Sequence, residues 1–175
     1  MIIEDALILK VNINEVELLR AISVQTFTET FAHQNSEEDM QKYVSENLSI
    51  EQLTKELNSK DSSFYFLKMN TQIIGYLKLN TGEAQTELKN NISLEIERIY
   101  VKLKYHGKNY GKLLMQKAMN IAKEMHYSYI WLAVWEFNIK AIGFYKKQGF
   151  IEFDKHTFKL GDDEQVDIMM KLQLK

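Results

Sequence analysis

The apolar residues of this chain change their spacing several times along its 175 residues, and the order of those changes limits the folds open to it. Between residues 14 and 60, apolar residues recur at intervals of three and four, as they do on one face of a helix. From residue 64 onward, short runs of branched and aromatic residues are separated by polar turns, which is typical of β-strands. Helical spacing returns at 114–125 and at 139–148. This mixture predicts an α/β fold of the α+β type.

Capping residues define the ends of the predicted helices more precisely. Ser36 and Ser49 are typical first residues of helices, Asn14 with Glu17 resembles a capping box, and Gly149 is a helix stop. The predicted order is a strand at 6–11, helices within 14–60, strands at 64–69, 73–79 and 92–101, a helix after 112, a strand at 129–135, a helix at 139–148, and strands at 150–160 and 165–174. This order predicts one domain over residues 1–175, with a mixed, largely antiparallel central sheet flanked by helices and one parallel crossover in its middle.

The strand at 92–101 carries an irregularity. Ile92, Leu94 and Ile96 share one phase of the alternation, whereas Ile99 and Val101 share the other. A β-bulge at Glu97-Arg98 would produce this slip. A strand that is buried on both faces would also produce it, so both interpretations stay open.

Composition excludes several classes of function. The net charge of −2 argues against a nucleic-acid binder that works by charge, and no apolar stretch approaches the roughly 20 residues of a membrane span. The first ten residues lack the basic flank and cleavage site of a signal peptide. Cysteine is absent, which excludes disulfides, cysteine–zinc sites and a cysteine nucleophile. His33 and His126 have no partners at metal-ligand spacing. We therefore expect a cytoplasmic protein without a metal, a membrane partner or a nucleic-acid partner.

The segment YHGKNYGK, residues 105–112, lies between a strand and a helix. It fits neither the Walker A loop nor the dinucleotide fingerprint, because its glycines have the wrong spacing. Free N–H groups and the positive end of a helix dipole nevertheless favour an anion at such a turn. The alternative is an ordinary strand-to-helix turn that carries lysines.

Three segments together resemble the GCN5-related N-acetyltransferase (GNAT) superfamily: IERIYV (96–101), HGKNYG (106–111) and NIKAIGFYKKQGFI (138–151). The resemblance implies the GNAT fold and acetyl-CoA as co-substrate. In the second segment, His106 replaces the usual Arg or Gln and Asn109 replaces a glycine. Asparagine tolerates a left-handed backbone better than most residues, so we expect the turn to persist.

The resemblance also implies which residues bind coenzyme A. The turn would hold the pyrophosphate, mainly through backbone N–H groups, and the His106 side chain would matter least. The pantetheine arm would lie along the splayed strand and against Asn138 and its helix. The implied cofactor-binding residues are Ile99, Tyr100, Val101, His106, Gly107, Lys108, Asn109, Tyr110, Gly111, Lys112, Asn138, Ala141, Phe144 and Tyr145.

Two catalytic residues follow from the same resemblance. Glu97 matches a glutamate that removes the proton of the acceptor amine, directly or through water, and Glu95 is the alternative base. Tyr145 matches a tyrosine that protonates or hydrogen-bonds the departing thiolate. Without functional roles, Glu97 would be part of an ion pair, and Tyr145 would be a core residue. With no cysteine available, direct attack in a ternary complex is favoured over an acyl-enzyme.

Residues 26–39 and 76–87 look similar to the PaiA-type spermidine/spermine N-acetyltransferases. This similarity implies a small polyamine-like acceptor, held by carboxylates and cation–π contacts. The candidate acceptor-binding residues are Phe27, Glu29, Phe31 and Glu37. Ordinary helix-start acids and core aromatics are the alternative. Other open possibilities are an amino acid, antibiotic or protein N-terminus as acceptor, a CoA-binding regulatory protein with little catalysis, and a homodimer.

Overall fold

The computed structural model describes residues 6–160 and 163–174, apart from the side chains of 158–160, 163 and 164. The strands are β1 (Ala6–Lys10), β2 (Ser62–Met69), β3 (Gln72–Asn80), β4 (Ser93–Val101), β5 (Tyr129–Trp135), β6 (Ile151–Leu160) and β7 (Asp163–Gln173). The helices are α1 (Val16–Phe31), α2 (Glu37–Asn47), α3 (Ile50–Asn58), α4 (Tyr110–Glu124) and α5 (Ile139–Lys147). Short 3-10 turns lie at Ile13–Glu15, Gly82–Ala84 and Leu103–Tyr105.

The strands of the described residues form one seven-stranded sheet in the order β1-β2-β3-β4-β5-β7-β6. Neighbouring strands are antiparallel, except that β4 and β5 run parallel. The predicted mixed sheet with one parallel crossover is therefore confirmed.

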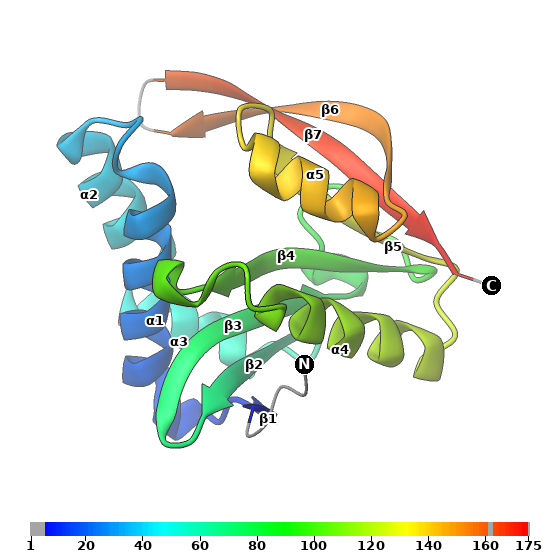
Figure 1. The fold of residues 1–175 in the computed structure, drawn as a ribbon, viewed down its shortest axis with the longest axis horizontal. Coiled ribbons are helices and arrows are strands. Elements are labelled where there is room, and N and C mark those ends of the chain that lie inside the picture. The colour runs from blue at the N-terminus through cyan, green and yellow to red at the C-terminus, as the bar shows by residue number, and fades with distance from the viewer. Residues whose placement is uncertain (1–5, 161–162, 175) are drawn as a thin grey trace.

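Helices pack on both faces of the sheet (Figure 1). The largest apolar cluster joins α4 and α5 to β3, β4, β5 and β7. A second cluster joins α1 and α3 to β2 and β3 on the opposite face. A third, built around Phe27, Met40 and Leu48, connects α1 to α2. The sheet is thus covered on both sides. The loop at 80–91 is tied to β5, because the Gln85 side chain accepts the indole N–H of Trp131 at 2.6 Å.

The helix starts follow local chemistry. The Ser36 hydroxyl accepts the N–H of Asp39, and the Ser49 hydroxyl accepts that of Gln52, each at 3.1 Å, so both predicted caps are confirmed. The predicted start at Asn14 is wrong. The N–H of Asn12 donates to Glu15 at 3.0 Å, and a 3-10 turn forms before α1 begins at Val16.

The bulge in β4 is also present. Arg98 pairs with Lys78 of β3 and Ile96 pairs with Leu79, so Glu97 is the extra residue between them. Because of this extra residue, Ile99 and Val101 return to the α4 face that Leu94 and Ile96 occupy. Of the two interpretations of the phase slip, the bulge is confirmed.

None of the helices in the described residues is long and apolar enough to cross a membrane.

Candidate active site

The two central strands, β4 and β5, separate in the middle of the sheet. Their parallel pairing is confined to Ser93–Glu95 against Tyr129–Trp131. Beyond that point β4 pairs only with β3, and β5 pairs only with β7. Within the described parts of the chain, the side of β4 that faces β5 therefore has no strand partner from Ile96 to Val101. An unpaired strand edge of this kind can hydrogen-bond an added extended chain.

The loop between β4 and α4 presents a row of backbone N–H groups. Gly107 and Asn109 have φ angles of 76° and 66°, and Asn109 directly precedes α4. The left-handed backbone expected at Asn109 is confirmed. Among the described residues, no acceptor takes the N–H groups of 107–111, whereas the N–H of Lys112 donates to the Asn109 carbonyl at 3.0 Å. Because a helix start carries partial positive charge, this row suits an anion.

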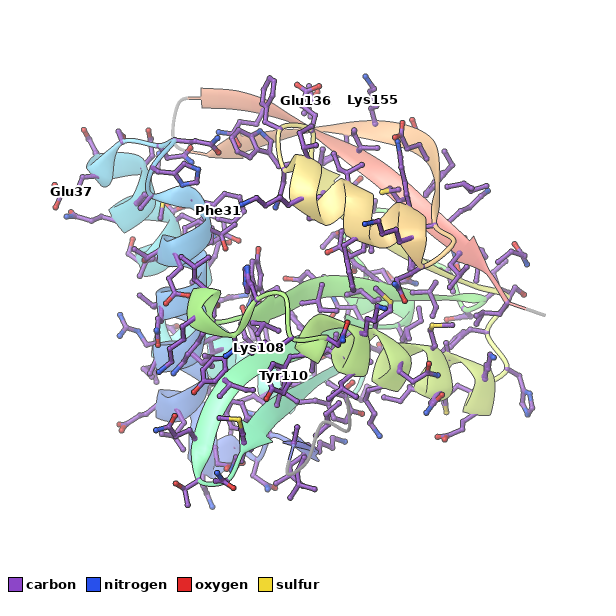
Figure 2. The ribbon with its side chains drawn as sticks, viewed as in Figure 1. Phe31, Glu37, Lys108, Tyr110, Glu136 and Lys155 are labelled. Carbon is purple, nitrogen blue, oxygen red and sulfur yellow. The ribbon has the colours of Figure 1, made fainter. Side chains whose placement is uncertain are left out.

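The side chains of this loop have different surroundings. The His106 ring lies 2.7 Å from the Val101 carbonyl and ties the loop to the end of β4. The buried Tyr110 hydroxyl donates to the Met69 sulfur at 3.2 Å, so only the backbone of Tyr110 is available to a ligand. Lys108 is exposed (Figure 2), and its ammonium lies 5.6 Å from the centre of the Tyr105 ring. The Lys108 charge can thus add to that of the helix start.

Helix α5 lies against the start of α4. A Cβ at Gly111 would lie 3.6 Å from the Phe144 ring, so the two helices touch at this point. The Asn138 side chain accepts the N–H of Ala141 at 3.2 Å, which confirms it as a helix cap. The structure therefore brings together the loop and the helix that the sequence assigned to coenzyme A.

Tyr145 is buried on α5, with its ring between Phe144 and Phe150 at centroid distances of 5.4 Å and 5.9 Å. Burial raises the pKa of its phenol well above the usual value. Tyr145 is close enough to Tyr100 of β4 that its charge would raise the pKa of that residue, after the larger effects of burial and of two other tyrosines. The Tyr145 hydroxyl stays protonated at physiological pH and can act as a hydrogen-bond donor beside β4.

A small pocket opens on the opposite face of β4, beneath α1 and α2. Its volume is about 80 Å³, which is room for a few waters or for the amine end of an acceptor. The residues that line it are Phe27, Tyr43, Leu48, Tyr76, Glu97, Arg98 and Tyr100. Phe27 and Tyr43 stack at 4.2 Å with nearly parallel rings. Aromatic rings thus surround one carboxylate and one guanidinium.

The charged groups of this pocket belong to a buried network. The Lys78 ammonium contacts both Glu97 and Glu56 of α3, the latter at 2.9 Å. Arg98 also contacts both, Glu56 at 3.2 Å and Glu97 at 3.1 Å. Two carboxylates are thus balanced by two cations. Burial alone would raise the pKa of Glu97, but Arg98, Lys78 and Asn80 outweigh it and hold the pKa below its usual value.

Glu95 lies deeper than Glu97. Its carboxylate accepts the backbone N–H of Thr86 at 2.9 Å and the Asn80 amide at 3.0 Å. Burial raises its pKa, against the lowering effect of the Thr86 hydroxyl. Glu95 is 2% exposed and is not part of the pocket lining, so of the two glutamates only Glu97 borders the pocket.

The four predicted acceptor-binding residues fall in different places. Phe27 lines the pocket. The centroid of the Phe31 ring lies 4.9 Å from the centroid of the Phe27 ring. The Glu29 carboxylate accepts the backbone N–H of Leu103 at 2.7 Å. Glu37 is exposed at the outer end of α2 (Figure 2) and accepts the Gln41 amide at 3.1 Å. Both of these carboxylates lie outside the pocket.

Sequence reasoning missed several residues of this site. Tyr76 and Arg98 line the pocket, and Lys78 and Glu56 hold its charges in place. One signal was available, since a lysine at position 78 interrupts an otherwise apolar strand. Glu56, on a helix surface, gave no such signal. In the described part of the chain, no group of three or more His, Asp or Glu side chains could hold a metal ion.

Comparison with known proteins adds family relationships to this geometry. Residues 20–150 match the model of the acetyltransferase (GNAT) family. The chain is 41% identical to an N-acetyltransferase of Lactobacillus delbrueckii subsp. lactis from the pepI 3' region, itself uncharacterized, over 88% of this chain and 89% of that protein.

Two further similarities involve Thermoplasma acidophilum. A spermidine N(1)-acetyltransferase of that organism is 27% identical over 93% of each chain. The crystal structure of its PaiA N-acetyltransferase in complex with coenzyme A superposes with a TM-score of 0.81 at 25% identity, over 97% of this chain and 99% of that one.

Proposed function

This chain belongs to the acetyltransferase (GNAT) family and is an acetyl-CoA-dependent N-acetyltransferase, and from that premise we propose that it acetylates a primary amine of a small polyamine such as spermidine or spermine. The pocket beside the β4 bulge carries this proposal, because it combines the Glu97 carboxylate with the rings of Phe27, Tyr43 and Tyr76. The Arg98 guanidinium in the same lining is already paired with Glu97 and Glu56. Carboxylates and aromatic faces are the groups that attract alkylammonium ions. The similarity to a spermidine N(1)-acetyltransferase supports the same acceptor class.

We place coenzyme A on the other side of β4. The backbone N–H groups of residues 107–111, which have no acceptor among the described residues, would bind its pyrophosphate. The Lys108 ammonium would add positive charge. The pantetheine arm would pair with the free edge of β4 at Ile99, Tyr100 and Val101. Its other wall would be formed by the α5 cap residue Asn138 and by Ala141 and Phe144 of that helix. The residues present fit this ligand, because they offer a row of donors followed by an unpaired extended edge.

This placement predicts the effect of the left-handed residue in the loop. Asn109→Val should raise the dissociation constant of coenzyme A about tenfold. A left-handed backbone costs a branched residue about 1–2 kcal/mol, so the loop would change conformation and its N–H groups would no longer point toward the pyrophosphate. Asn109→Gly should change it less than about twofold. Calorimetric titration with coenzyme A measures both.

A matched control is available at the other end of α4, where His126 has a φ of 57°. His126→Val imposes a similar backbone strain away from the loop and should leave coenzyme A binding unchanged. Equal weakening by Asn109→Val and His126→Val would show that the N–H row is not the binding site.

For the chemical step, we propose that Glu97 assists deprotonation of the acceptor through water. The acceptor arrives as an ammonium with a pKa near 10, while the pKa of Glu97 is below its usual value. Direct transfer between them would be uphill by more than about 7 kcal/mol. Glu97 is therefore better suited to hold the ammonium and to orient a water that passes the proton to solvent. The neutral amine then attacks the thioester carbonyl directly, since the chain has no cysteine to carry an acyl group.

We propose that Tyr145 stabilises the departing thiolate. Its buried phenol remains protonated and donates a hydrogen bond to the sulfur. A thiol has a pKa near 8.5, far below that of this phenol, so hydrogen bonding rather than full proton transfer is the expected contribution. For Glu29 and Glu37, which lie outside the pocket, we propose only a general attraction of a polycation, which salt screens beyond about 8 Å.

Release of free thiol from acetyl-CoA tests the acceptor class. The purified protein should acetylate spermidine and spermine with at least about tenfold higher kcat/KM than alanine, lysine, an N-terminal alanine peptide or a streptothricin. A higher kcat/KM for the peptide or the antibiotic would show that the acceptor is of that class and not a polyamine. Tight binding of coenzyme A without turnover of any amine would instead favour a regulatory protein.

A further inference from the structure

Asp167 is a half-buried carboxylate that the proposed reaction does not use. It lies on β7, opposite Trp135 of β5 and His156 of β6. Of the side chains that the structure describes, none forms a salt bridge or a hydrogen bond with its carboxylate. Burial raises its pKa to about 6, with His156 acting in the opposite direction. At neutral pH, Asp167 is therefore an ionised group without a paired cation among those side chains.

A series of aromatic rings connects Asp167 to the acceptor pocket. The Trp135 ring lies 6.2 Å from that of Phe31, Phe31 lies 4.9 Å from Phe27, and Phe27 stacks on Tyr43 at 4.2 Å. Figure 2 shows Phe31 at the end of α1 nearest β6 and β7. The charge of Asp167 is one of the smaller influences that raise the pKa of Tyr43, so the carboxylate and this pocket residue sense each other.

Ordered side chains of neighbouring elements surround Asp167. The Gln165 amide on the same strand donates to Asn35, in the link between α1 and α2, at 3.0 Å. The indole nitrogen of Trp135 is buried and has no hydrogen-bond acceptor among the described residues. A buried donor of this kind is usually satisfied by a water, because an ammonium has no lone pair and cannot accept the indole N–H. This end of the aromatic path thus holds an unpaired carboxylate and an unused donor.

The two ends of the path carry matching chemistry. Glu97 borders the pocket at one end, Asp167 stands at the other, and ring faces lie between them. Ammonium groups separated by methylene chains fit this alternation, because carboxylates bind the charges and rings cover the methylenes. Building on the proposed function, we propose that Asp167, opposite Trp135 on the neighbouring strand, binds the distal ammonium of a di- or polyamine whose reacting amine lies in the Glu97 pocket.

The placement of Asp167 has a consequence for stability. A carboxyl whose pKa is raised by the fold binds its proton more tightly in the folded state, so the fold loses stability as pH rises from about 4 to above 6. The groups that face Asp167 are His156 of β6, which pairs with Glu87 at 3.3 Å, and Tyr43 of α2. Asp167→Asn should therefore raise the melting temperature at pH 7.5, and this gain should disappear below about pH 4.

Acetylation kinetics with matched amines test the proposal. Asp167→Asn should raise the KM of spermidine at least about tenfold, with kcat and the KM of n-butylamine changed less than about twofold. Asp167→Glu should restore most of the spermidine affinity. Asp154→Asn, an exposed carboxylate on β6, is the control and should leave both substrates unchanged. An equal change for the monoamine and the polyamine, or no change for either, would overturn the distal-ammonium site.

These outcomes are separable from a failure of the proposed function. If the wild-type protein acetylates polyamines and Asp167→Asn has the same KM for spermidine, the proposed function is supported and the distal-ammonium site is rejected. If the wild-type protein acetylates no polyamine, the proposed acceptor class is rejected. The distal-ammonium site is then tested by measuring spermidine binding. Spermidine should then raise the melting temperature of the coenzyme A complex in the wild-type protein but not in Asp167→Asn; equal shifts, or none in either, would overturn it.

Discussion

Replacing Tyr145 by phenylalanine is expected to lower kcat about 10²-fold while the dissociation constant of acetyl-CoA stays within about twofold. The substitution removes only the hydroxyl, and the ring contacts with Phe144 and Phe150 remain. Removing one hydrogen-bond donor that stabilises the charge developing in a transition state typically lowers kcat about 10²–10³-fold. Single-turnover measurement of thiol release, together with calorimetric titration of acetyl-CoA, separates the chemical step from binding.

Tyr105→Phe is the matched control, because Tyr105 is also buried and its hydroxyl donates to Gln72 at 3.1 Å. Its kcat should stay within about threefold of the wild-type value. A large loss of acetyl-CoA affinity in Tyr145→Phe would assign Tyr145 to binding. An unchanged kcat would leave it as a core residue.

Replacing Lys78 by methionine is expected to destabilise the protein by about 3–5 kcal/mol, because it leaves Glu56 and Glu97 buried with Arg98 as their remaining cation. For a chain of this size, such a loss corresponds to a melting temperature lower by roughly 6–20 °C. Urea denaturation of the two proteins at pH 7 measures the difference in the free energy of unfolding.

Lys68→Met is the control, because Lys68 pairs with Glu15 at 3.5 Å and both side chains are about a quarter exposed. Its loss should be below about 1 kcal/mol. Glu56→Gln combined with Lys78→Met should recover part of the stability, since it removes one unpaired charge. Equal losses in Lys78→Met and Lys68→Met would contradict a cooperative buried network.

The network also predicts a pH dependence. The folded state lowers the pKa of Glu97, so its stabilising contribution is complete above the unfolded pKa of about 4.3 and is lost as pH falls through the lower folded value. Lys78→Met should weaken this dependence, because one of the two cations that lower the pKa is gone. The stability difference between the two proteins should therefore shrink as pH falls below about 4.

Much of the fold could be predicted because its signals are local. The caps at Ser36, Ser49 and Asn138 depend on a hydroxyl or amide that reaches a backbone N–H three residues away. The left-handed turn at Asn109 depends on that residue's own conformational preference. The bulge at Glu97 left a phase slip that the sequence shows directly, although a strand buried on both faces would look the same.

The pocket and the charged network beside β4 could not be predicted in this way. Sequence places several glutamates on helices and strands, but their partners come from distant parts of the chain. Glu29 bonds Leu103, Glu56 bonds Arg98, and only Glu97 borders the pocket. Helical periodicity gives the face on which a carboxylate lies and does not give what packs against that face.

The sequence by itself determined the order of elements, the left-handed turn before α4 and the GNAT resemblance, because each depends on residues close together in the chain. Only the tertiary structure decided that Glu97 is held at a lowered pKa by Arg98 and Lys78. It also decided that Asp167 lies at the end of an aromatic path from the pocket, without a paired cation among the side chains that the structure describes. Charge pairing and burial depend on which strands and helices meet. That is fixed by packing between segments up to more than a hundred residues apart, as in the bond between Gln165 and Asn35.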